Sequence, residues 1–110
     1  MFNIFGCAQD KNTEMTITEL KQGMKENPDL LILDVRTPAE LTGSLGKIDG
    51  VINIPVQELV ARMGELEKYK DKDIAVICRT GNRSGTATRI LREQGYKAKN
   101  VLGGMVEYRE

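Results

Sequence analysis

The feature that most constrains the fold of this chain is a polar heptapeptide, Cys78-Arg79-Thr80-Gly81-Asn82-Arg83-Ser84. An apolar run with β-branched residues, Asp73–Ile77, precedes it, and a segment with helical periodicity, residues 86–94, follows it before Gly95. Together they predict a strand, a tight loop and a helix. Backbone N–H groups converge at such a junction, and the positive end of the helix dipole points at it, so the loop suits a negatively charged group.

Cys78 has two interpretations. Free cysteine is among the most buried residue types, so the thiol alone could be a small core hydrophobe. An arginine-rich loop alone could be a passive anion site, and the Gly81-Asn82 pair alone could be an ordinary turn. Their combination with Arg79 and Arg83 at a strand–helix junction favours a reactive thiolate, which is the nucleophilic form of cysteine.

The composition limits how such a thiol could be activated. The chain has no histidine, which removes Cys–His pairs and histidine metal sites. Its two cysteines, Cys7 and Cys78, do not form a Cys-x-x-Cys motif, so we expect no metal, cofactor or disulfide framework. Activation must then come from charges and dipoles. With 16 basic and 16 acidic side chains, the chain offers no electrostatic case for binding nucleic acid.

The rest of the sequence alternates between strand and helix patterns. The strands are predicted at residues 14–16, 30–33, 51–54, 73–77 and 99–102. The helices are predicted at residues 18–25, 37–41, 57–63, 86–94 and 105–110. We expect Thr18 to cap the first helix. This order is typical of an α/β fold with a mostly parallel sheet and helices on both faces.

The length suits a single domain, which we place at residues 14–110, with residues 1–13 as a flexible tail. Ile4-Phe5-Gly6-Cys7 has a passing likeness to a lipoprotein cleavage box, but a basic start and an apolar run of roughly 7–15 residues are missing. No apolar run approaches the roughly 18 residues of a membrane span. We expect a cytoplasmic protein, with export or lipid anchoring as the alternative if the N-terminus is truncated. Cys7 could also be a resolving thiol, but only the fact that it is a cysteine supports this interpretation.

Three further polar residues follow the strand at 30–33. Asp34 and Arg36 stand at its carboxyl end, and Glu40 lies a few residues on. Ligands of open α/β sheets gather at the carboxyl ends of strands, so Asp34 and Arg36 are expected near Cys78. We favour a structural ion-pair cluster that supports the loops over a catalytic role for these three residues.

At this point the sequence resembles a known family. Residues 78–84 resemble the active-site loop of rhodanese-type sulfurtransferases. Three flanking segments also resemble that family: Leu33-Asp34-Val35-Arg36-Thr37-Pro38-Ala39-Glu40, Gly50-Val51-Ile52-Asn53-Ile54-Pro55 and Val101-Leu102-Gly103-Gly104-Met105. The resemblance runs from about Met15 to Glu110 and implies a rhodanese-like sheet of about five short strands. The family often has a histidine where Lys47 stands, so Lys47 is given no role, and Tyr108 replaces the usual tryptophan.

The resemblance also implies a reaction. The Cys78 thiolate would take the outer sulfur of a donor such as thiosulfate, release sulfite and carry a persulfide, which cyanide, a cellular thiol or a sulfur-accepting protein would then discharge. The backbone N–H groups of residues 79–84, Thr80 and Asn82 included, would cradle the anion. Arg79 and Arg83 would attract the donor. Gly81 would allow the tight turn, and Ser84 would cap the helix and donate a hydrogen bond.

Two other functions fit parts of the pattern. Phosphatases and arsenate reductases of related folds use a similar cysteine–arginine loop. Those phosphatases have five residues between cysteine and arginine, whereas four separate Cys78 from Arg83. The shorter loop suits one sulfur atom better than a phosphoryl group, so we place phosphoryl transfer well below sulfur transfer. A non-enzymatic sulfur carrier or regulatory module is the alternative from another class. Such modules often lose the cysteine, which this chain retains with both arginines.

Overall fold

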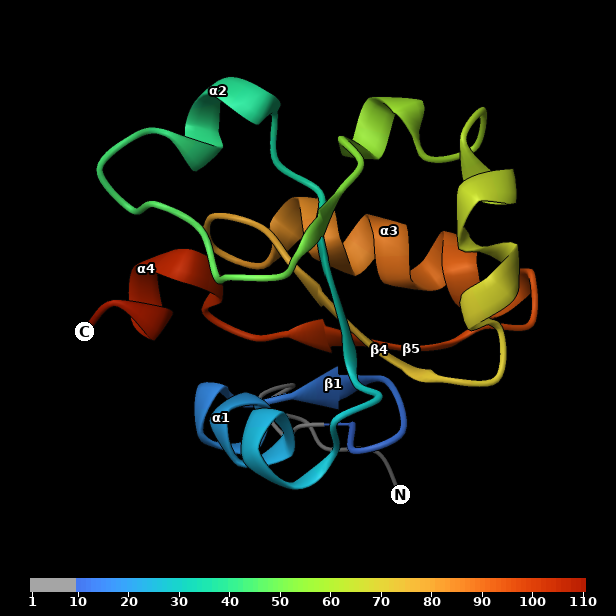
Figure 1. The fold of residues 1–110 in the computed structure, drawn as a ribbon, viewed down its shortest axis with the longest axis horizontal. Helices are drawn as coiled ribbons and strands as arrows, with labels where there is room; N and C mark the ends of the chain where they lie inside the picture. Colours follow the sequence, from blue (N-terminus) through green and yellow to red (C-terminus); the bar gives the residue numbers. More distant parts are fainter. Residues whose placement is uncertain (1–9) are drawn as a thin grey trace, which may run out of the picture.

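The computed structural model describes residues 10–110 and contains a five-stranded sheet in the order β1-β5-β4-β2-β3 (Figure 1). All four strand pairings are parallel. The strands are β1 Glu14–Met15, β2 Leu31–Asp34, β3 Ile52–Asn53, β4 Asp73–Ile77 and β5 Lys97–Val101. The α-helices are α1 Ile17–Glu26, α2 Pro38–Leu41, α3 Asn82–Glu93 and α4 Gly104–Tyr108, and the 3-10 helices are η1 Val56–Glu58 and η2 Met63–Tyr69.

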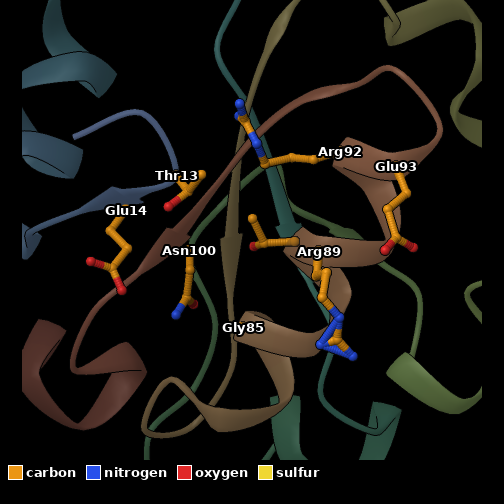
Figure 2. Close-up of a pocket in the computed structure, with 8 residues that line it drawn as sticks. Thr13, Glu14, Gly85, Arg89, Arg92, Glu93 and Asn100 are labelled. Atoms are coloured by element: carbon orange, nitrogen blue, oxygen red, sulfur yellow. The ribbon is translucent and has the colours of Figure 1, made fainter. Parts of the chain in front are cut away.

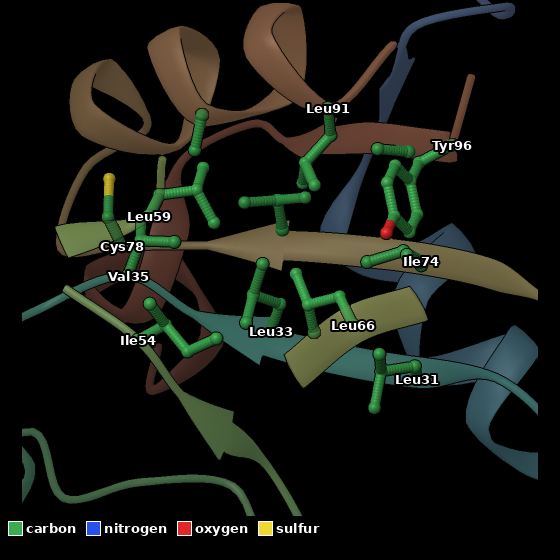
Figure 3. Packing of buried hydrophobic residues seen from close by; sticks show 13 residues of the cluster. Leu31, Leu33, Val35, Ile54, Leu59, Leu66, Ile74, Cys78, Leu91 and Tyr96 are labelled. Carbon is green, nitrogen blue, oxygen red and sulfur yellow. The ribbon is translucent and has the colours of Figure 1, made fainter. Parts of the chain in front are cut away.

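The two central strands are covered on both faces, as their uninterrupted apolar runs predict. Alternate side chains of β2 and β4 enter two separate hydrophobic clusters, as the twofold period of a strand requires. The cluster under α3, η1 and η2 includes Leu33, Leu66 and Leu91 (Figure 3). The opposite cluster, under α1 and α4, includes Leu20 and Met105. The predicted α/β architecture with helices on both faces is therefore confirmed.

The first helix begins earlier than predicted. Its cap is Thr16 and not Thr18: the Thr16 hydroxyl accepts a hydrogen bond from the Glu19 N–H at 3.1 Å. The Glu19 carboxylate accepts one from the Thr16 N–H at 2.9 Å. This reciprocal arrangement is a capping box, which satisfies two backbone donors at once. Thr18 is an exposed residue of the first turn.

The helix predicted at residues 57–63 is wrong. The chain forms the two short 3-10 helices η1 and η2 instead. Leu59 and Leu66 are fully buried, whereas Val60, which the prediction placed on the apolar face, is 70% exposed. Leu59 and Leu66 therefore hold the segment in the core at two separate points. The apolar residues do not form one continuous helical face across residues 57–63.

Within residues 10–110, no helix is long and apolar enough to cross a membrane. Residues 1–9, which hold Cys7 and most of the predicted tail, lie outside the described part of the chain.

Candidate active site

Cys78 directly follows the carboxyl end of β4 and is the first residue of the loop. Helix α3 starts at Asn82, so it takes in residues that were predicted as loop. Gly81 precedes the helix with φ of +113°. That left-handed conformation favours glycine, because a Cβ atom would be strained there. The tight turn predicted at Gly81 is therefore present, and it bends the backbone around the sulfur.

The Cys78 sulfur accepts several hydrogen bonds from this loop. The N–H groups of Gly81 and Ser84 lie 3.1 Å and 3.3 Å from Sγ. The Ser84 hydroxyl oxygen lies 3.2 Å from it. Cys78 is only 1% exposed and packs at one end of the cluster that contains Val35 and Leu59 (Figure 3). The sulfur therefore lies inside a ring of polar groups that includes two backbone donors, and apolar side chains pack behind it.

Burial and hydrogen bonding act in opposite directions on this thiol. Burial disfavours the charged form and raises the pKa of Cys78. The Ser84 hydroxyl and the N–H groups of Ser84, Gly81 and Thr80 favour the thiolate. These hydrogen bonds outweigh burial, so the pKa of the Cys78 thiol lies below its ordinary value. The same groups would stabilise an anion bound at the sulfur.

The two arginines of the loop have different surroundings. The Arg83 guanidinium forms a bidentate pair with Glu40, with both N–O distances at 2.8 Å. This pair lowers the pKa of Glu40 to about 2 and raises that of Arg83. The charge of the Cys78 thiolate also raises the pKa of Arg83, but it does so by less than the pairing with Glu40. Arg79 is exposed, and its side chain has no ion-pair partner among residues 10–110.

Asp34 and Arg36 form a second, fully buried pair beside the loop. Arg36 Nη2 lies 2.7 Å from Asp34 Oδ2, and the exposed fractions of the two side chains are 1% and 0%. Arg36 also donates to the Gly46 carbonyl at 2.7 Å. Asp34 pairs in register with Ile77, the residue before Cys78, so it lies near the loop as expected. Its carboxylate is occupied by Arg36, as in a structural ion pair.

Ser84 does not cap helix α3, contrary to the prediction. It lies in the first turn of the helix, after the cap residue Gly81. Its buried hydroxyl is shared between Cys78 Sγ and Asn100 Oδ1, which lies 2.5 Å away on β5. The sequence pattern does not indicate Asn100 as a neighbour of the site, because its contact with Ser84 depends on how β5 packs against α3.

The C-terminal Gly-Gly segment is also part of the site. The Met105 N–H donates to the Cys78 carbonyl at 2.9 Å, and the Val106 N–H donates to the Arg79 carbonyl at 3.0 Å. Helix α4 thus satisfies two carbonyl groups of the loop through its first N–H groups. Gly104, with φ of +57°, brings the two backbones together.

Two cavities flank this region. A cavity of about 170 Å³ is lined by Arg79 and by the Arg36 and Glu40 ion-pair residues, together with Gly43, Ser44 and Leu45. A larger one, of about 480 Å³, lies between α3 and β5 and has Asn100, Gly85 and Arg89 in its wall (Figure 2). Within residues 10–110, no cluster of three histidine, cysteine or acidic side chains is placed to bind a metal.

Comparison with known proteins agrees with this fold and loop. The sequence profile of the Rhodanese-like domain matches residues 16–110. A sulfurtransferase of Allochromatium vinosum is 34% identical over 96 residues, which cover 86% of each protein. The thiosulfate sulfurtransferase PspE of Escherichia coli is 34% identical over 66% of this chain and 68% of its own. The crystal structure of a rhodanese-related protein from Thermoplasma volcanium superposes with a TM-score of 0.78 at 36% identity, covering 88% of this chain and 90% of its own.

The five-stranded parallel sheet, with Cys78 directly after the central strand β4, agrees with this match to the Rhodanese-like domain. The chain belongs to the rhodanese-like domain family, and relatives over most of its length are named sulfurtransferases.

Proposed function

We propose that this protein is an enzyme that transfers sulfane sulfur from an anionic donor, such as thiosulfate, to a thiophilic acceptor through a persulfide on Cys78. The observation that carries the proposal is the ring of polar groups around Cys78 Sγ, formed by the N–H groups of Gly81 and Ser84, which donate to the sulfur, and by the Ser84 hydroxyl. This ring favours the thiolate without a histidine, and the thiolate is the form that attacks sulfur.

In the first half-reaction, the Cys78 thiolate attacks the outer sulfur of thiosulfate. An S–S bond forms between Cys78 and that sulfur, and the bond from that sulfur to the sulfite group breaks. Sulfite leaves with the bonding electron pair, so Cys78 carries a persulfide anion and no proton moves. The terminal sulfur of the persulfide takes over the negative charge, which the loop N–H groups can stabilise.

In the second half-reaction, the acceptor attacks the outer sulfur of the persulfide. Cyanide forms a C–S bond and leaves as thiocyanate, while the S–S bond breaks and returns its electrons to the Cys78 thiolate. A thiolate acceptor would become a persulfide in the same manner. Neither half-reaction requires a general base or an external oxidant, which agrees with a chain that has no histidine.

The surroundings of Arg79 support the proposal that the sulfur donor is an anion. Its exposed guanidinium has no ion-pair partner in the described chain and lines the 170 Å³ cavity next to the loop. Arg83 is less available, since both of its terminal nitrogens bind Glu40. We therefore assign the attraction of thiosulfate mainly to Arg79 and the fixing of the loop mainly to Arg83.

The proposal is tested by steady-state formation of thiocyanate from thiosulfate and cyanide. Cys78→Ser should abolish turnover, and Cys7→Ser should leave it nearly unchanged. Wild-type turnover by Cys78→Ser would refute the mechanism. If the wild type forms a stable persulfide but transfers sulfur to neither cyanide nor small thiols, the non-enzymatic sulfur-carrier alternative replaces the enzyme.

A further inference from the structure

The side chain of Asn100 is connected to the reactive sulfur through one hydroxyl group. Ser84 Oγ lies 3.2 Å from Cys78 Sγ and 2.5 Å from Asn100 Oδ1. Ser84 and Asn100 are 0% and 8% exposed, so both residues of this chain of contacts are buried. Asn100, on β5, also lines the larger cavity (Figure 2).

The orientation of the Asn100 amide is fixed by the backbone. Asn100 Nδ2 donates to the Gly81 carbonyl at 3.2 Å, and a carbonyl oxygen can only accept a hydrogen bond. The amide nitrogen must therefore face Gly81, which turns Oδ1 toward Ser84. A carbonyl oxygen this close to the Ser84 oxygen requires a hydrogen between them, and only the Ser84 hydroxyl can supply it.

The Ser84 hydroxyl has one hydrogen and two neighbours that compete for it. When Cys78 is a thiol, its own S–H can point at Ser84 Oγ while Ser84 donates to Asn100, so every contact has one hydrogen. When Cys78 is a thiolate, Ser84 donates best to the sulfur. The oxygens of Ser84 and Asn100 would then face each other without a hydrogen, which is unfavourable in a buried site.

We propose that Asn100 is a positioning residue that holds the Ser84 hydrogen away from Cys78 in the thiol state, so that ionisation of the sulfur must break the Ser84–Asn100 hydrogen bond. Asn100 thus opposes the thiolate, while the N–H groups of Gly81 and Ser84 favour it. The inference needs Cys78 only as an ionisable thiol, so it stands or fails separately from the sulfur transfer proposed above.

Several other charged groups surround the loop. They are Arg79 and Arg83 from the loop and α3, Asp34 and Arg36 at the end of β2, Glu40 on α2 and Glu107 on α4. None of these groups is changed in the variants tested below. A shift in the titration of Cys78 after a change at Asn100 therefore reports on the Ser84 contact.

The test is the pH dependence of iodoacetamide alkylation of Cys78, with every variant made in a Cys7→Ser background. Asn100→Leu removes the competing acceptor and should lower the alkylation midpoint by about half to one pH unit, the equivalent of one hydrogen bond. Asn100→Asp keeps an acceptor and adds a negative charge, so it should raise the midpoint. A merely structural role would move both variants in the same direction.

Two further variants isolate the route through Ser84. In a Ser84→Ala background, Asn100→Leu should cause no further shift, because the shared hydrogen is gone. Thr88→Val is the matched control: it removes another buried hydroxyl of α3, one with no partner among the described residues, and should leave the midpoint unchanged. An unshifted or raised midpoint for Asn100→Leu, or an equal shift with and without Ser84, would overturn the proposal.

Discussion

Gly104 lies so close to Cys78 that a Cβ atom at Gly104 would come within 2.6 Å of the Cys78 carbonyl oxygen. The neighbouring N–H of Met105 donates to that same oxygen at 2.9 Å. The Gly-Gly segment therefore allows the start of α4 to dock on the backbone that carries Cys78. Its glycines are required by close approach as well as by their positive φ angles.

Gly104→Ala should damage both the fold and the loop. The methyl group would meet backbone atoms that cannot move without shifting Cys78, and φ of +57° is strained for alanine. We expect a loss of about 2–3 kcal/mol in the free energy of unfolding, measured in urea, and a large fall in thiocyanate formation. Gly64→Ala is the control, because nothing lies within 4 Å of the added atom. Equal stability of the two variants would contradict the docking argument.

Arg79 and Arg83 should affect catalysis differently. Arg79→Met removes the exposed cation and should raise the KM for thiosulfate about tenfold, the equivalent of one charge-assisted hydrogen bond. Arg79→Lys should restore most of this loss because it keeps the charge. Arg83→Met should reduce stability as well, since it leaves Glu40 without its partner. Initial rates at varied thiosulfate concentration measure the KM of each variant. An unchanged KM in Arg79→Met would be evidence against a role of Arg79 in attracting thiosulfate.

The Glu40–Arg83 pair should make stability depend on pH. The pKa of Glu40 falls from 4.5 to about 2 on folding, so the pair stabilises the protein fully above the unfolded value. This stabilisation is lost as the pH falls through the folded value. Both side chains are about one-third exposed, which limits the contribution to about 1 kcal/mol.

Unfolding of wild type and Glu40→Gln in urea as a function of pH measures this contribution. The difference between the two proteins should be constant above about pH 5 and shrink toward zero at about pH 2. A difference that stays constant across this whole range would show that the carboxylate charge of Glu40 contributes nothing.

The buried pair of Asp34 and Arg36 should matter for folding more than for chemistry. Arg36→Met leaves a fully buried carboxylate unpaired, which costs about 3–5 kcal/mol. We expect a markedly lower urea midpoint, with turnover per folded molecule close to that of the wild type. A fully folded Arg36→Met protein without activity would instead place Arg36 in the catalytic machinery.

The local parts of this architecture could be predicted from the sequence. The apolar run at residues 30–33 and the one before Cys78 lie in buried central strands, and Gly81 has the positive φ that a tight loop needs. These features depend only on residues that are close together in the sequence, so the apolar pattern and the position of glycine are enough to predict them. Helix α3 begins in the predicted loop because the turn at Gly81 already places Asn82 in helical geometry.

The contacts that tune the site could not be predicted from local spacing. Arg83 is paired with Glu40, 43 positions away, so one of the two loop charges expected to act on the sulfur is largely committed elsewhere. Asn100 reaches Ser84 only because β5 packs against α3. The Ser84 hydroxyl and the N–H groups of Ser84, Gly81 and Thr80 therefore lower the pKa of Cys78 more than the two arginines do.

Mass spectrometry of the protein after incubation with thiosulfate, without an acceptor, tests the central claim most directly. The peptide that contains Cys78 should gain the mass of one sulfur atom, with one sulfite released per protein, and cyanide should remove the added sulfur as thiocyanate. Cys78→Ser should gain nothing, and Cys7→Ser should behave as the wild type. Thiocyanate formation with no sulfur on Cys78, or with the sulfur on Cys7 instead, would contradict the account.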